Sequence, residues 1–173
     1  MSKFGHPEKQ GLYNPSKEHD SCGIGFVANI KNRKSSKVVQ QGLTILSCLT
    51  HRGAAGSEPL AGDGAGILVQ IPDRFLREEC AELDITLPEV GAYGVGMAFL
   101  PQIEKARADC EKAIEDLVRA EGQSVLGWRD LPTDNSWLSD SVRELEPFIR
   151  QIFVDKGEYC ADNNVFERKL FVI

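Results

Sequence analysis

The stretch EHDSCGIGFVANI, residues 18–30, marks an abrupt change in the character of the chain. Residues 1–21 are polar, contain glycine and proline, and show no hydrophobic period, so we expect them to form an extended leader. Residues 23–30 alternate small and apolar side chains, which predicts a buried strand. Cys22 therefore stands at the start of a strand, and Gly23 after it lets a ligand approach the backbone closely.

The composition limits the classes of function. Of the 173 residues, 42% are hydrophobic and 27% are charged, as in an ordinary globular domain. The net charge of −6 argues against a nucleic-acid or anionic-membrane partner, because both require a basic surface. No apolar run approaches the ~20 residues of a membrane span, and the N-terminus lacks the apolar core of a secretory signal. We therefore expect a cytoplasmic protein with no membrane or nucleic-acid partner.

The cysteines and histidines show neither a disulfide framework nor a metal site. Five cysteines form no CxxC pair, and three histidines are scattered over positions 6, 19 and 51. An odd number of cysteines without an export signal makes structural disulfides unexpected, and no spacing fits zinc or an iron–sulfur cluster. The expected metal content of this chain is none.

The hydrophobic pattern after residue 30 alternates between helical and strand periods. Strands are expected over residues 93–100, 124–131, 148–154 and 166–173, and residues 62–71 are expected to be a glycine-rich turn that leads into an apolar strand. Helices are expected over residues 38–49, 73–83, 104–122 and part of 133–146. Ser35 or Ser36 is the expected N-cap of the first helix, and Asp73 that of the second. The expected inner face of the third helix consists of Ala106, Cys110, Ala113, Ile114 and Leu117. On its own, this alternation favours a parallel α/β sheet.

A second cluster of small and charged residues follows the first predicted helix. The sequence HRGAAG (51–56) is followed by GDGAG (62–66), two glycine-rich turns that hold Arg52, Gly53 and Asp63 between a helix and a strand. Glycine turns and an arginine at a helix end are common features when they occur alone. The second turn is no phosphate loop, because it precedes a strand and lacks a Lys-Ser/Thr pair.

Taken together and in this order, these motifs resemble the N-terminal class II glutamine amidotransferase domain of the glutamate synthase large subunit. The resemblance runs from QGLYNPSKEHDSCGIGFVANI through LTHRGAAG, GDGAGILVQIPDRFLREE and YGVGMAFLP to VLGWRDLPTD, IRQIFV and FERKLFVI, which is nearly all of residues 10–173. It implies an α+β fold, the αββα sandwich of N-terminal nucleophile hydrolases with two mostly antiparallel sheets, present here as a partial domain. Part of such a sandwich would leave apolar strand faces exposed, so the isolated chain is expected to aggregate readily.

The resemblance assigns the chemistry to Cys22. A cysteine thiol with a pKa near 8.5 is mostly protonated at neutral pH, so it needs a base. In N-terminal nucleophile enzymes that base is the α-amine of the nucleophile itself, whose pKa of about 7.7–8.0 suits proton relay. Cys22 has an α-amine only after cleavage, so residues 1–21 are expected to be a propeptide and residues 22–173 the amidotransferase part. The implied supporting residues are Gly23, Arg52 and Gly53, with Arg52 close to the thiol or, alternatively, pairing with a surface carboxylate.

The implied substrate is L-glutamine, and the implied complete enzyme is larger than this chain. The complete enzyme would add a synthase portion with FMN and an iron–sulfur cluster, which uses the ammonia to make glutamate from 2-oxoglutarate, and a small subunit or ferredoxin as partner. No segment here matches the family's oxyanion hole or its clamp for the glutamine α-carboxylate. Two alternatives remain open: a non-catalytic piece that binds a partner chain, and a different class II amidotransferase, such as those that make amidophosphoribose, glucosamine phosphate or asparagine.

Overall fold

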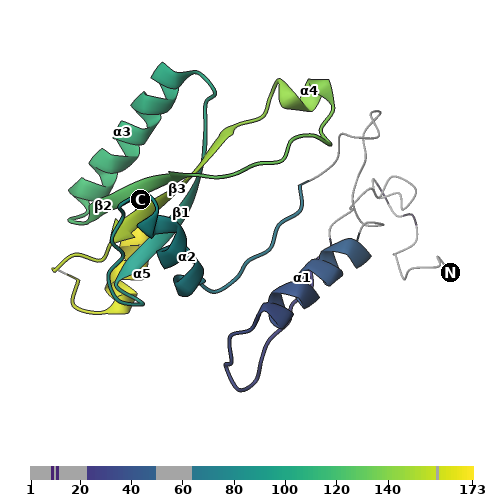
Figure 1. The fold of residues 1–173 in the computed structure, drawn as a ribbon, viewed down its shortest axis with the longest axis horizontal. Helices are drawn as coiled ribbons and strands as arrows, with labels where there is room; N and C mark the ends of the chain where they lie inside the picture. Colours follow the sequence, from purple (N-terminus) through teal and green to yellow (C-terminus); the bar gives the residue numbers. More distant parts are fainter. Residues whose placement is uncertain (1–8, 10, 12–22, 50–63, 159) are drawn as a thin grey trace. The chain divides into compact units, whose positions relative to one another are not determined.

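The computed structural model describes residues 9, 11, 23–49, 64–158 and 160–173. The chain divides into two compact units, Met1–Leu68 and Val69–Ile173. The first unit contains α1 (Ser36–Cys48), drawn in dark blue in Figure 1. The elements of the second unit are α2 (Asp73–Ala81), β1 (Tyr93–Leu100), α3 (Glu104–Ala120), β2 (Ser124–Asp130), α4 (Asp140–Arg143), β3 (Phe148–Asp155) and α5 (Asn163–Val172).

The three strands form one antiparallel sheet in the order β1-β3-β2. β3 is the central strand and pairs along its whole length with β1, from Tyr93 opposite Asp155 to Leu100 opposite Phe148. The register of β2 against β3 shifts between Val125 and Gly127, which indicates a β-bulge. The expected strands 93–100, 124–131 and 148–154 are thus confirmed. The parallel sheet favoured by the alternation alone is wrong, whereas the antiparallel pairing implied by the resemblance is present.

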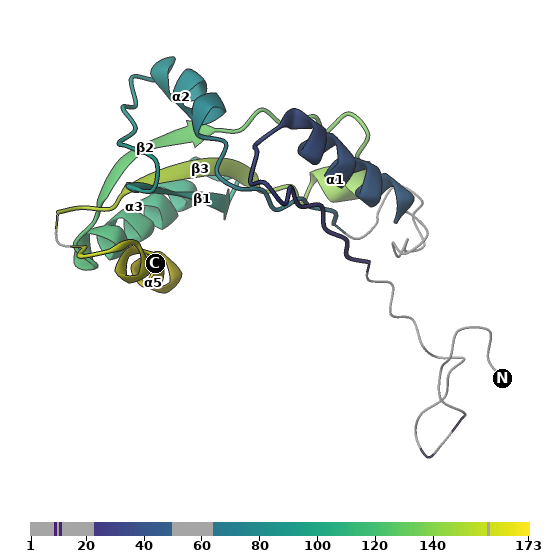
Figure 2. The ribbon, with the colours of Figure 1, turned by 90° about the horizontal axis from the view of Figure 1, so that it is seen from below.

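Helices cover the two faces of this sheet unequally. Figure 2 shows α2 on one side of the strands and α3 with α5 on the other. On the α2 side, Leu76 and Cys80 pack with Leu87, Tyr93 and Phe153. On the opposite side the buried residues are Val118, Ile152 and Val154, with Ile114 and Leu170 packed against them. Alternate residues of β3 therefore supply both cores, as the two-residue period of a strand requires.

Three predicted strands are wrong, and each lacks what stabilises a strand. Residues 23–29 and 64–71 form no strand, and the side chains of Ile24 and Phe26 are 95% and 90% exposed. An extended segment gains stability only when a neighbouring backbone pairs with it, and every strand in the described ranges pairs within the second unit. Residues 166–173 lie mostly in α5, because the Asp162 carboxylate caps this helix by accepting from the Val165 amide at 2.8 Å.

The helices are close to the expected ranges, but their details differ. Ser35 occupies the N-cap position of α1 without a side-chain capping bond. Pro72 is the N-cap of α2, and Asp73 is its first residue rather than its cap. The inner face of α3 is rotated from the prediction: Val118 is fully buried, whereas Leu117 is 51% exposed. α4 is the short helix expected within residues 133–146.

Candidate functional site

Three of the four predicted site residues lie outside the described residues. These are Cys22, Arg52 and Gly53. Gly23 is described; it is exposed and belongs to no helix or strand. The described ranges therefore place only the segment that begins one residue after the predicted nucleophile.

Two close contacts at glycines hold the segments of the first unit together. A Cβ atom on Gly25 would lie 2.6 Å from Cγ2 of Ile45, so the segment after Cys22 packs directly on α1. A Cβ atom on Gly42 would likewise lie 2.9 Å from Cδ1 of Ile67, so the segment 64–68 approaches the same helix. This role of Gly25 was not predicted. The signal was available in the sequence GIGF (23–26), in which glycines alternate with large apolar residues.

A local turn ends the segment that follows the predicted nucleophile. The Asn29 side-chain oxygen accepts hydrogen bonds from the amides of Lys31 at 2.9 Å and Arg33 at 3.3 Å. Asn32 has a φ of 50°, a left-handed conformation that asparagine tolerates better than most residues. This turn lies between the segment 23–28 and the start of α1 at Ser36.

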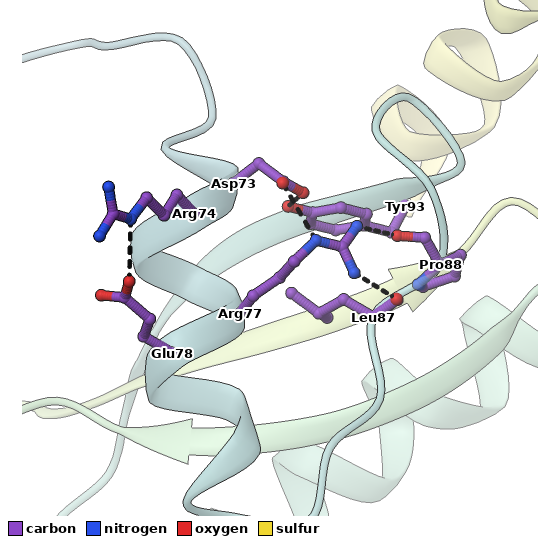
Figure 3. Close-up of polar contacts among 7 residues, drawn as sticks. All are labelled: Asp73, Arg74, Arg77, Glu78, Leu87, Pro88 and Tyr93. Atoms are coloured by element: carbon purple, nitrogen blue, oxygen red, sulfur yellow. Dashed lines mark hydrogen bonds and ion pairs between the residues drawn. The ribbon is translucent and has the colours of Figure 1, made fainter. Parts of the chain in front are cut away.

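The second unit contains a partly buried polar network at the start of α2, shown in Figure 3. Tyr93 is 2% exposed, and its hydroxyl donates to Oδ1 of Asp73 at 2.9 Å. Arg77 donates to Oδ2 of the same carboxylate at 3.0 Å and to the Leu87 and Pro88 carbonyls. The network ties the first turn of α2 to β1 and to the chain before it.

The electrostatics of this network assign it a structural role. Burial, together with the hydrogen bond to Asp73 and the charge of that carboxylate, raises the pKa of Tyr93 to about 12. The phenol is therefore protonated throughout the range in which enzymes usually operate, and it cannot act there as a general base. The hydrogen bond to Asp73 raises the pKa of Arg77 above its already high value, so this guanidinium is a permanent cation.

Two further arginines join the helices to the sheet. Arg129 on β2 pairs with Glu79 of α2 and donates to Gln151 on β3 at 3.0 Å. Arg150 on β3 contacts Glu111 of α3 at 2.7 Å and Asp130 at 2.6 Å, and it lies over the Trp128 ring. Because each guanidinium faces carboxylates of neighbouring elements, these contacts fix positions of helices and are not a reaction centre.

The described ranges contain no cluster of metal-binding side chains, and two hollows in the second unit have no thiol in their lining. No group of three or more His, Cys, Asp or Glu side chains among these residues could hold a metal ion. The two best-formed hollows, of about 240 and 360 Å³, are open depressions in the second unit. No cysteine or histidine lines either of them. No helix in the described part of the chain has the length and apolar character that crossing a membrane requires.

Comparison with known proteins identifies the class to which this chain belongs. Residues 22–173 match the family of class-II glutamine amidotransferases, and the chain is a member of that family. The resemblance inferred from the motifs is thus confirmed, and the matched region begins at Cys22.

The relatives within this class are glutamate synthases. The chain is 49% identical over 167 residues to the large chain of the NADPH glutamate synthase of Bacillus subtilis, an alignment that covers 96% of this chain and 11% of that protein. It is 45% identical over 150 residues to the NADH glutamate synthase of Saccharomyces cerevisiae, covering 84% of this chain and 7% of that protein. Ferredoxin-dependent glutamate synthase 2 of Synechocystis is 36% identical over 155 residues, an alignment that covers 90% of this chain and 10% of that protein. The chain spans about a tenth of the length of these relatives.

Proposed function

We propose that this chain is the glutamine-hydrolysing part of a glutamate synthase and that Cys22 is its nucleophile. The family match over residues 22–173, together with relatives that are named as glutamate synthases, supports the proposal most strongly. These names also disfavour an amidotransferase of another product class, and no relative's name supports the binding-only piece. Released ammonia would serve glutamate synthesis from 2-oxoglutarate in a synthase portion that carries FMN and an iron–sulfur cluster.

The proposed reaction proceeds by acyl transfer through the thiol. The Cys22 sulfur forms a bond to the side-chain carbonyl carbon of L-glutamine while its proton passes to the α-amine of the same residue. The C–N bond then breaks, and the leaving nitrogen takes that proton as ammonia departs, which leaves a γ-glutamyl thioester. Water, deprotonated by the same amine, attacks the thioester; the C–S bond breaks, the amine returns the proton to the sulfur, glutamate is released and the free thiol is regenerated.

The α-amine makes this proposal conditional on removal of residues 1–21. While the leader is attached, the nitrogen of Cys22 is an amide with no basic lone pair, so proton relay by this route is impossible. A match that begins at Cys22 itself supports a boundary at that residue. We propose that cleavage between Ser21 and Cys22 activates the enzyme.

Arg52 and the two glycines have supporting roles in this proposal. A guanidinium close to the sulfur would favour the thiolate by lowering the pKa of Cys22. Gly23 and Gly53 would let the substrate approach the backbone on either side of the thiol. The contact between Gly25 and Ile45 supports the idea that α1 holds the segment after the nucleophile in place.

The proposed fold around this site is the αββα sandwich of N-terminal nucleophile hydrolases. The antiparallel sheet with α3 and α5 on one face is consistent with one half of such a sandwich. On the opposite face α2 covers one end, while Met97 and Phe99 stay exposed at the other. An apolar face of this kind suits packing against a second sheet.

The decisive experiment compares Cys22→Ala with Cys48→Ala in the protein as its gene encodes it. Cys48 lies at the end of α1 and is exposed, so it is a matched thiol outside the proposed chemistry. Cys22→Ala should lower ammonia release from glutamine by at least about 10³-fold, as loss of a nucleophile does, while Cys48→Ala should retain activity. After treatment of the enzyme with an electrophilic glutamine analogue, mass spectrometry should find the analogue covalently attached to Cys22.

N-terminal sequencing of the active enzyme is the second measurement. The first residue should be Cys22. An active enzyme that retains Met1 would refute the role of the α-amine, and full activity of Cys22→Ala would refute the nucleophile itself.

A further inference from the structure

We draw no further inference here: the strongest candidate, the apolar surface that Phe75, Met97 and Phe99 expose on the α2 side of the sheet, carries nothing, because no described feature shows what covers it and its burial against a second sheet would restate the fold proposed above.

Discussion

At the scale of single residues, polar side chains of the second unit are organised around a few buried partners. Tyr93 and Arg77 share the two oxygens of Asp73, so that one carboxylate satisfies a phenol and a guanidinium. A buried hydroxyl left without an acceptor would cost about 1–3 kcal/mol, which explains why the tyrosine and the aspartate occur together. The sequence alone does not predict this contact, because the tyrosine and the aspartate are 20 positions apart in the chain.

The raised pKa of Tyr93 predicts a pH dependence. Its folded pKa of about 12 lies above the ordinary value of 10. The resulting stabilisation is therefore complete below pH 10 and is lost as the pH rises through 12. In a titration of tyrosinate absorbance, one of the three tyrosines should ionise near pH 12, and Tyr93→Phe should remove that step. Concentrated urea should move the step down to about 10; a step that persists in Tyr93→Phe would contradict the assignment.

At the scale of elements, glycine positions determine how closely helices approach the sheet. A Cβ atom on Gly94 would lie 2.6 Å from Cδ1 of Leu170, so β1 accepts α5 only because this position has no side chain. Gly127 on β2 has the same relation, at 2.6 Å, to Ile85, which lies in the segment between α2 and β1. At each of these positions the glycine leaves space that the apolar side chain of another segment fills.

The pair Gly94 and Leu170 gives a prediction for packing. Gly94→Val should destabilise the protein by about 1–3 kcal/mol, because the new side chain overlaps Leu170. Gly64→Ala is the control, since no atom of the described residues lies within 4 Å of its Cβ position. The double variant Gly94→Val/Leu170→Ala should cost less than the sum of the single variants in urea unfolding, because the leucine vacates the space. Additive costs would show that α5 does not pack on Gly94.

α5 itself offers a comparison between two phenylalanines of one helix. Phe166 is 2% exposed and Phe171 is 93% exposed. Phe166→Ala should lower the free energy of unfolding by about 3–5 kcal/mol, through lost burial and the cavity it leaves. Phe171→Ala should change it by no more than about 0.5 kcal/mol. Urea unfolding followed by tryptophan fluorescence measures both, and equal effects would argue against the observed face of the helix.

At the scale of the whole molecule, the two units differ in how much they bury. None of the residues of α1 in the first unit is buried. In the second unit β3 buries Ile152, Phe153 and Val154 between two helical layers. Local opening costs least where few apolar contacts must be broken, so the free energy of opening should differ strongly between the units.

Hydrogen exchange tests this difference. Amides in the middle of β3 should exchange on the order of 10³-fold or more slowly than those in the middle of α1, relative to the same peptides in concentrated urea. Comparable protection in both elements would show that α1 is stabilised by burial that the described ranges do not contain.

Family membership was readable from the sequence, because it rests on residue types in a fixed order: the sequences CGIGF (22–26), HRG (51–53) and GDGAG (62–66). The strands of the sheet and the helices α1 to α3 were also predictable, since each carries its own hydrophobic period. The roles of Cys22, Arg52 and Gly53 stay predictions, because they lie outside the described residues.

Only the tertiary structure decided which periodic segments became strands and which faces were buried. Residues 23–30 have the alternation of a strand but pair with no backbone among the described residues. The segment 163–172 became α5 because Asp162 caps it and Leu170 packs against Gly94 on β1. The inner face of α3 likewise turned toward Val118, where Glu111 can also reach Arg150. The local hydrophobic pattern indicates which secondary structures a segment can form. Contacts with segments distant in the sequence determine which of these structures is stable.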